Sequence, residues 1–152
     1  MKTRFKGMKK IWKYGFLLFI SLIFARISRA QNGSLCIWVN GYEDTGGDML
    51  FSLYNQADGW PSDRTKIYKP GKIMRVSDDE VMYCYRNLPY GSYAVAVLYD
   101  INHDGDMNYN FFGLPTEEYG FSNNPRVYLS APSFERCKVI LDKSRVQIEV
   151  NL

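Results

Sequence analysis

The sequence predicts an all-β protein, an antiparallel β-sandwich of about seven strands in two sheets. Short apolar segments recur along residues 31–152, separated by turn residues about every 8–12 positions. No long stretch of this region has the 3.6-residue period of an amphipathic helix. The region is also the right size for one domain.

Residues 1–30 are predicted to be a cleaved secretory signal peptide. A basic beginning precedes an apolar run, Phe16–Ala25, that is too short to span a bilayer comfortably. Small residues, Ser28 and Ala30, precede the expected cleavage point before Gln31. We therefore expect an exported domain, periplasmic or extracellular, that meets a membrane only during export; a retained N-terminal anchor is the alternative. The basic residues include Lys2, Arg4, Lys6, Lys9, Lys10 and Lys13.

Loss of this segment reverses the sign of the net charge. The chain has 19 basic and 16 acidic residues, and eight of the basic residues lie before residue 31. The remaining chain has 11 basic and 16 acidic residues, a formal charge of −5. Because nucleic-acid binding needs a basic face, we expect no nucleic-acid partner.

The first half of the domain is expected to contain five strands. The first two show apolar residues at alternate positions, which is typical of strands with one buried face. Lysines in the next two short segments suit strands at a sheet edge. Trp60, in the loop between these pairs, is expected to cap the edge of the core. The expected strands are 35–39, 49–53, 66–69, 72–76 and 81–87.

Residues 93–99 are predicted to form a central strand. The segment is β-branched and aromatic with small residues between, and neither of its faces carries a charge. We therefore expect it to be covered on both faces. One face would present Tyr93, Val95, Val97 and Tyr99, and the other Ala94, Ala96 and Leu98.

The end of the chain is expected to add three strands, at 126–129, 138–141 and 146–150. Alternating Val146, Ile148 and Val150 mark the last of them. Residues 142–144 are expected to turn a hairpin between the last two strands, and residues 132–136 to form one short helical turn.

Side-chain oxygens follow the central strand at alternate positions, with a glycine at the sixth place. This spacing matches the first half of an EF-hand loop, which can wrap one calcium ion. The twelfth position is Phe111, where an EF-hand has a bidentate Glu, so a site would need a later oxygen such as that of Asn108, Glu117 or Glu118. The alternative interpretation, which the sequence favours, is an Asx-rich turn whose side chains bond their own backbone. The candidate ligands are Asp100, Asn102, Asp104, Asp106 and Asn108.

The segment 109–124 that follows is long and rich in aromatic residues. A connection of this length is usually functional or disordered, and its aromatic content argues against disorder. We expect it to pack as a flap on the sandwich edge, with display of its aromatic side chains to a partner as the alternative.

The stretch from Gly91 to Asn124 resembles the signature of domain-of-unknown-function family 2141. Its shared features are a Gly-x-Tyr-Ala-Val strand, an Asp/Asn/Gly loop and Gly-Phe-Ser-Asn-Asn, and Ala131–Glu135 also fits. Members usually carry Asp where this chain has Asn108. The segment 87–93 is similar to strands of transthyretin-like and carboxypeptidase-regulatory-like sandwiches. These resemblances imply an exported immunoglobulin-like or transthyretin-like sandwich and no established activity.

Three cysteines, Cys36, Cys84 and Cys137, allow at most one disulfide within the chain. All three pairings stay open, as does a set of three buried thiols. The only histidine, His103, lies between polar loop residues and is expected to be solvated.

The sequence shows no catalytic constellation, so we expect a non-enzymatic exported binding or accessory domain. Its partner would be an envelope protein, a peptide or a carbohydrate, with no cofactor other than calcium in the Asp/Asn/Gly loop. The alternatives are a hydrolase that uses carboxylates near the same loop, and a structural module that assembles through an exposed sheet edge.

Overall fold

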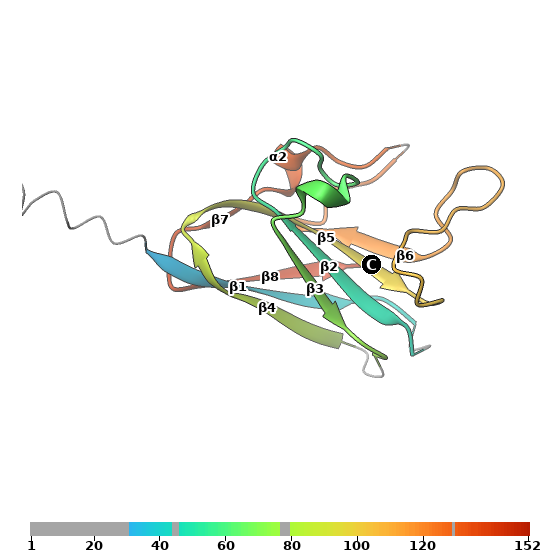
Figure 1. Cartoon of the computed structure of the whole chain (residues 1–152), viewed down its shortest axis with the longest axis horizontal. Coiled ribbons are helices and arrows are strands. Elements are labelled where there is room, and N and C mark those ends of the chain that lie inside the picture. The colour runs from blue at the N-terminus through green and yellow to red at the C-terminus, as the bar shows by residue number, and fades with distance from the viewer. Residues whose placement is uncertain (1–30, 44–45, 77–79, 129) are drawn as a thin grey trace, which may run out of the picture. The chain divides into compact units, whose positions relative to one another are not determined.

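The strands of the computed structural model form two facing sheets (Figure 1). The structure describes residues 31–43, 46–76, 80–128 and 130–152, so the predicted signal peptide lies outside the described residues. The first sheet has the order β4 (Glu80–Pro89), β1 (Asn32–Asn40) and β8 (Arg145–Asn151). The second has the order β3 (Lys69–Ile73), β2 (Asp48–Tyr54), β5 (Gly91–Asp100) and β6 (Glu118–Phe121), and β7 (Val139–Leu141) also pairs with β5.

The predicted all-β sandwich is confirmed, with eight strands in the described part of the chain. Two short helical segments accompany them, η1 (Arg64–Lys66) and α2 (Phe134–Cys137), and α2 matches the predicted helical turn within a residue or two. Among the described residues, no helix has the length and apolar character needed to cross a bilayer.

Strand β5 is central, as its uncharged sequence predicts. It pairs with β2, β6 and β7. Tyr93, Val95, Val97 and Tyr99 face the other sheet and are at most 3% exposed. On the opposite face Ala94 joins a second buried cluster with Tyr54, Phe121, Phe134 and Cys137. Burial on both faces makes this strand the rigid element from which the following loop begins.

Trp60 caps the second cluster, as predicted. Its ring packs edge-on against Tyr54, with 5.2 Å between centroids, and contacts Phe121 and Phe134. Its indole N–H donates to the carbonyl of Pro132 at 2.8 Å, which satisfies the polar atom of a half-buried ring.

Three expectations about the strands are wrong. Segments 66–69 and 72–76 give one strand, β3, preceded by η1, because Asp63 caps that turn by accepting the Thr65 N–H at 2.9 Å. Residues 126–128 form no strand, and residue 129 lies outside the described part of the chain. Residues 142–144 do not close a hairpin: β7 pairs with β5, whereas β8 crosses to the other sheet and pairs in parallel with β1.

Strand β6 went unpredicted because its sequence, Glu-Tyr-Gly-Phe, is short and contains a glycine. A Cβ on Gly120 would lie 2.7 Å from the carbonyl oxygen of Asn151 and from a methyl group of Val150. Glycine therefore permits the close approach of β8, a tertiary requirement that strand propensity does not express.

Cys36 and Cys84 form a disulfide between directly opposed residues of β1 and β4, and Cys137 is a buried free thiol. The bond closes a loop of sequence separation 48 within the first sheet. A cross-link of this span restricts the unfolded chain and stabilises the fold by about 4 kcal/mol in the chain-entropy model.

We predict that Cys36→Ser/Cys84→Ser lowers the free energy of unfolding by roughly 2–4 kcal/mol, measured by denaturant titration. Reductant should lower the unfolding midpoint of the wild-type domain toward that of the double variant and leave the variant unchanged. Equal midpoints for the oxidised wild type and the variant would contradict the assignment.

Candidate functional site

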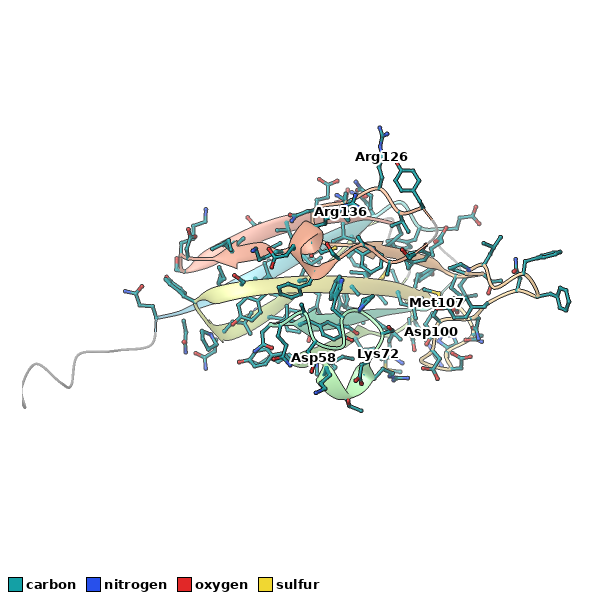
Figure 2. The ribbon with its side chains drawn as sticks, turned by 90° about the horizontal axis from the view of Figure 1, so that it is seen from above. Asp58, Lys72, Asp100, Met107, Arg126 and Arg136 are labelled. Carbon is teal, nitrogen blue, oxygen red and sulfur yellow. A yellow bond between two sulfur atoms is a disulfide. The ribbon has the colours of Figure 1, made fainter. Side chains whose placement is uncertain are left out.

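The candidate site begins where β5 leaves the sheet, at the fully buried Asp100. The Asp100 carboxylate accepts the backbone N–H of Asp104 at 3.2 Å and of Gly105 at 2.9 Å. Gly105 has a φ of 82° and His103 a φ of 64°, so the chain turns through two left-handed residues. We call residues 100–108 the acidic loop. Figure 2 shows Asp100 and Met107 at the same end of the sheets.

Three of the predicted ligands converge above this turn. One oxygen of Asp104, Oδ2, accepts the side-chain amide of Asn102 at 2.9 Å and that of Asn108 at 3.1 Å. The Asn102 amide also donates to Asn108 Oδ1 at 2.9 Å. The Asp106 backbone N–H, followed by the Asn108 and Asn102 amides, holds the pKa of the exposed Asp104 below its ordinary value. The loop thus has the Asx-rich hydrogen bonding that the sequence favours.

Asp106 does not join this group. Its carboxylate forms an exposed ion pair with the guanidinium of Arg64, which lies on η1. Of the five candidate ligands, the side chains of Asp100, Asn102, Asp104 and Asn108 are therefore linked by hydrogen bonds within the loop, and that of Asp106 is engaged outside it.

Glu117 is the later carboxylate that folds back to the loop. It is 8% exposed, and its two oxygens accept the backbone N–H groups of Ile101 and Asn108, both at 3.1 Å. The neighbouring Glu118 instead accepts the backbone N–H of Glu43 at 3.3 Å. The sequence predicts both Glu117 and Glu118 as possible later ligands. Neighbouring side chains of an extended chain point to opposite sides, so only one of the two can face the acidic loop.

Asp100 and Glu117 are buried carboxylates without a cationic partner. Among the described residues their hydrogen-bond donors are backbone N–H groups, and no Lys, Arg or His side chain pairs with either. A buried charge is costly unless it is compensated, and backbone donors supply only part of the compensation. Within the described part of the chain, no three His, Cys, Asp or Glu side chains are grouped to hold a metal ion.

Asp48 is a third buried carboxylate at this end, and sequence reasoning missed it. It pairs in register with Asp100 across β2 and β5, so it could be found only once the strand pairing was known. Its carboxylate lies 2.5 Å from the Lys72 ammonium and 3.2 Å from His103 Nδ1, and accepts the Arg75 N–H at 2.9 Å. His103 is therefore not simply solvated.

The acid–base behaviour of Asp48 follows from these contacts. Burial alone would raise its pKa, but the hydrogen bonds from Lys72, Arg75 and His103 outweigh burial and lower the pKa to about 2. The ionised Asp48 thus ties β2 both to the strand after it and to the acidic loop.

The chain beyond the acidic loop forms a turn that we call the apical turn, residues 109–115. Tyr109 and Pro115 are bridged in antiparallel fashion at its base. The exposed fraction is 97% for Phe111 and 82% for Phe112. The expectation that this segment packs on the sandwich is wrong here, because the turn carries its side chains away from the sheets. It is correct for Phe121, which is buried, and for the half-buried Tyr119.

A shallow hollow of about 390 Å³ lies on the three-stranded sheet, away from the acidic loop. Trp38 is 39% exposed at its wall, and Asn40 donates to Glu149 across it at 2.7 Å. Its lining residues are Trp38, Asn40, Glu80, Gln147, Ile148 and Glu149.

Comparison with known proteins gives one match. Residues 37–149 match a family model described as an uncharacterized protein conserved in bacteria, DUF2141. No curated protein and no solved structure matches the chain significantly.

We predict that stability falls as the pH drops from about 4 to about 2, because the folded pKa of Asp48 lies below its unfolded value of 3.8. Its ionised form stabilises the fold above this window, by on the order of 2 kcal/mol, and protonation removes that contribution. Asp48→Asn should lower the free energy of unfolding at pH 7 and flatten its dependence on pH below 4, as followed by urea titration. If the free energy of unfolding of Asp48→Asn fell below pH 4 as steeply as that of the wild type, this role would be contradicted.

Proposed function

The chain belongs to DUF2141, a bacterial family described as uncharacterized, and we propose that it is an exported, non-enzymatic binding or accessory domain. In this proposal the acidic loop holds calcium and the apical turn is the binding surface. The observation that carries the proposal is the pair of buried carboxylates, Asp100 and Glu117, at the base of an exposed aromatic turn. Neither has a cationic partner among the described residues.

Calcium suits this loop better than other ions because its donors are hard oxygens. Calcium takes 6–8 oxygen ligands and tolerates irregular geometry. The loop offers side-chain oxygens from Asp100, Asn102, Asp104 and Asn108, and Glu117 supplies a later carboxylate. The Asp106 side chain pairs with Arg64. Asp106 would therefore contribute its backbone carbonyl, as the seventh position of an EF-hand does.

Binding requires a small rearrangement. The amide nitrogens of Asn102 and Asn108 both point at Asp104 Oδ2, where they supply the positive ends of dipoles. A half-turn of each amide about its last torsion replaces nitrogen by oxygen and turns this cluster into a set of acceptors. The bound ion would then replace the two N–H donors as the partner of Asp104.

The same contacts argue against the hydrolase alternative at this loop. A general acid or base must reach the substrate, yet Asp100 and Glu117 are buried and bonded to backbone N–H groups. Among the described residues, His103 has Asp48 as its partner and no Ser, Thr or Cys hydrogen-bonded to it, so no nucleophile–base pair is formed.

We predict that calcium at millimolar concentration raises the free energy of unfolding of the domain by about 1–3 kcal/mol, as expected for a ligand at 10–100 times its Kd. Asp100→Asn/Asp104→Asn should abolish this increase, because it removes two of the charges that attract the ion. The measurement is thermal unfolding over a calcium titration, with magnesium as the comparison ion.

Asp142→Asn is the matched control, since Asp142 is an exposed carboxylate in a turn outside the loop. It should keep the full response to calcium. Glu117→Gln tests the later ligand separately and should weaken the response. A calcium response of equal size in the wild type and the Asp100/Asp104 variant would refute the site.

A further inference from the structure

We propose that the apical turn inserts into the interfacial layer of a lipid bilayer, anchoring the exported domain reversibly. The inference deepens the proposed function, on which it rests for the choice of the apical turn as the binding surface. It goes beyond the expectation from the sequence that the chain meets a membrane only during export.

The apical turn concentrates apolar surface at one projecting point. Figure 1 shows the chain between β5 and β6 extending past the ends of the strands. Phe111 and Phe112 pack edge-on against each other with 5.6 Å between ring centroids. Tyr109 and Leu114, at 62% and 59% exposure, flank them. A contiguous exposed apolar group of this kind marks an interaction site, whereas isolated apolar residues do not.

Four backbone N–H groups of the turn are already satisfied from within. The Asn110 side-chain oxygen accepts the N–H groups of Phe112 and Leu114, at 2.9 and 3.0 Å. The Asn110 N–H donates to the carbonyl of Leu114, and the Gly113 N–H donates to the carbonyl of Asn110, each at 2.9 Å. The turn can therefore leave water without orphaning these four donors.

These four internal hydrogen bonds lower the cost of leaving water, which favours lipid over a protein pocket. A protein pocket can supply hydrogen-bond partners to an entering loop, but hydrocarbon supplies none, so a segment that enters lipid must satisfy its own backbone. Phenylalanine and leucine are also among the side chains whose transfer into a bilayer is favourable.

The charged residues lie at the base of the apical turn and not at its tip. No charged residue occurs from Met107 to Thr116. The exposed carboxylates of Asp104 and Asp106 lie at the base, where they would remain at the level of the lipid headgroups. Asp106 is paired with Arg64, but the exposed Asp104 and the formal charge of −5 on residues 31–152 repel an anionic surface. The partner is therefore a zwitterionic bilayer in the absence of divalent cations. Calcium bound in the acidic loop would neutralise the base and admit anionic lipid.

The strength of such an anchor is modest. Two phenylalanines and their neighbours bury far less apolar surface than a membrane-spanning helix, and even a single acyl chain gives only reversible binding. The turn therefore holds the domain at a membrane surface reversibly.

The test uses residues 31–152, because both buried clusters and all the described strands lie within this segment. Binding to phosphatidylcholine vesicles is measured by co-sedimentation for the wild type, Phe111→Ala/Phe112→Ala and the control Tyr128→Ala. Tyr128 is 78% exposed on a different loop. We expect the double variant to bind roughly tenfold more weakly or worse, since two exposed rings lose their burial, and the control to bind normally.

Depth is read separately from Phe112→Trp, after subtracting the emission of the wild type, which contains Trp38 and Trp60. The remaining emission should shift to the blue on adding vesicles and be quenched by lipids brominated along the acyl chain, whereas Tyr128→Trp should show neither effect. With phosphatidylglycerol included, wild-type binding should weaken without calcium and recover with it. Calcium-independent binding to phosphatidylcholine supports the anchor even if the calcium site fails its own test.

Either of two vesicle-binding results would overturn the anchor, and so would one result with a protein partner. One is a wild-type domain that binds calcium but sediments with no vesicle composition, which leaves the proposed calcium site intact. The other is equal vesicle binding by the wild type and the Phe111/Phe112 variant. Binding of the turn to an apolar pocket of a protein, without any vesicle binding, would also exclude the bilayer as its partner.

Discussion

The hydrogen bonds to the buried Asp100 carboxylate are the constraint on which this end of the molecule depends. Strand β5 has one fully buried face and a second face that is buried at Ala94 and half-buried at Ala96 and Leu98, and the chain turns sharply as it leaves the sheet. Asp100 lies at the last position of the strand and takes the N–H groups of Asp104 and Gly105, which turns the chain within five residues. The turn therefore requires a buried carboxylate, and among the described residues its hydrogen-bond donors are backbone N–H groups.

The sequence was sufficient for the central strand and for the turn that follows it. The uncharged alternation of residues 93–99 predicted a central strand, and the acidic spacing predicted the turn after it. It was insufficient where the outcome depends on which strands become neighbours. Gly120 has a low strand propensity, and its role is evident only from the close packing of β8 against it. Asp48 is the first residue of β2, and its proximity to Asp100 is evident only from the pairing of β2 with β5.

The exposure of the apical turn could not be predicted from its amino-acid composition, because it depends on how the backbone of the turn is hydrogen-bonded. Aromatic residues are usually buried, and Tyr119 and Phe121, only a few positions later, are packed against the sheet. What separates the two groups is the backbone: the Asn110 hydrogen bonds close the turn on itself and leave no extended chain with which to fold back onto the sandwich. The same two bonds also satisfy the N–H groups of Phe112 and Leu114 without water.

Asn108 joins the acidic loop to the apical turn through hydrogen bonds of its side chain and its backbone. Its side chain donates to Asp104, its N–H donates to Glu117, and its carbonyl accepts the Thr116 N–H at 3.0 Å, at the base of the apical turn. A carboxylate at this position would repel the Asp104 carboxylate and require a cation to hold the same arrangement. The amide removes that repulsion, so in this chain hydrogen bonds set the direction of the apical turn, and calcium would take the place of the two amide donors to Asp104.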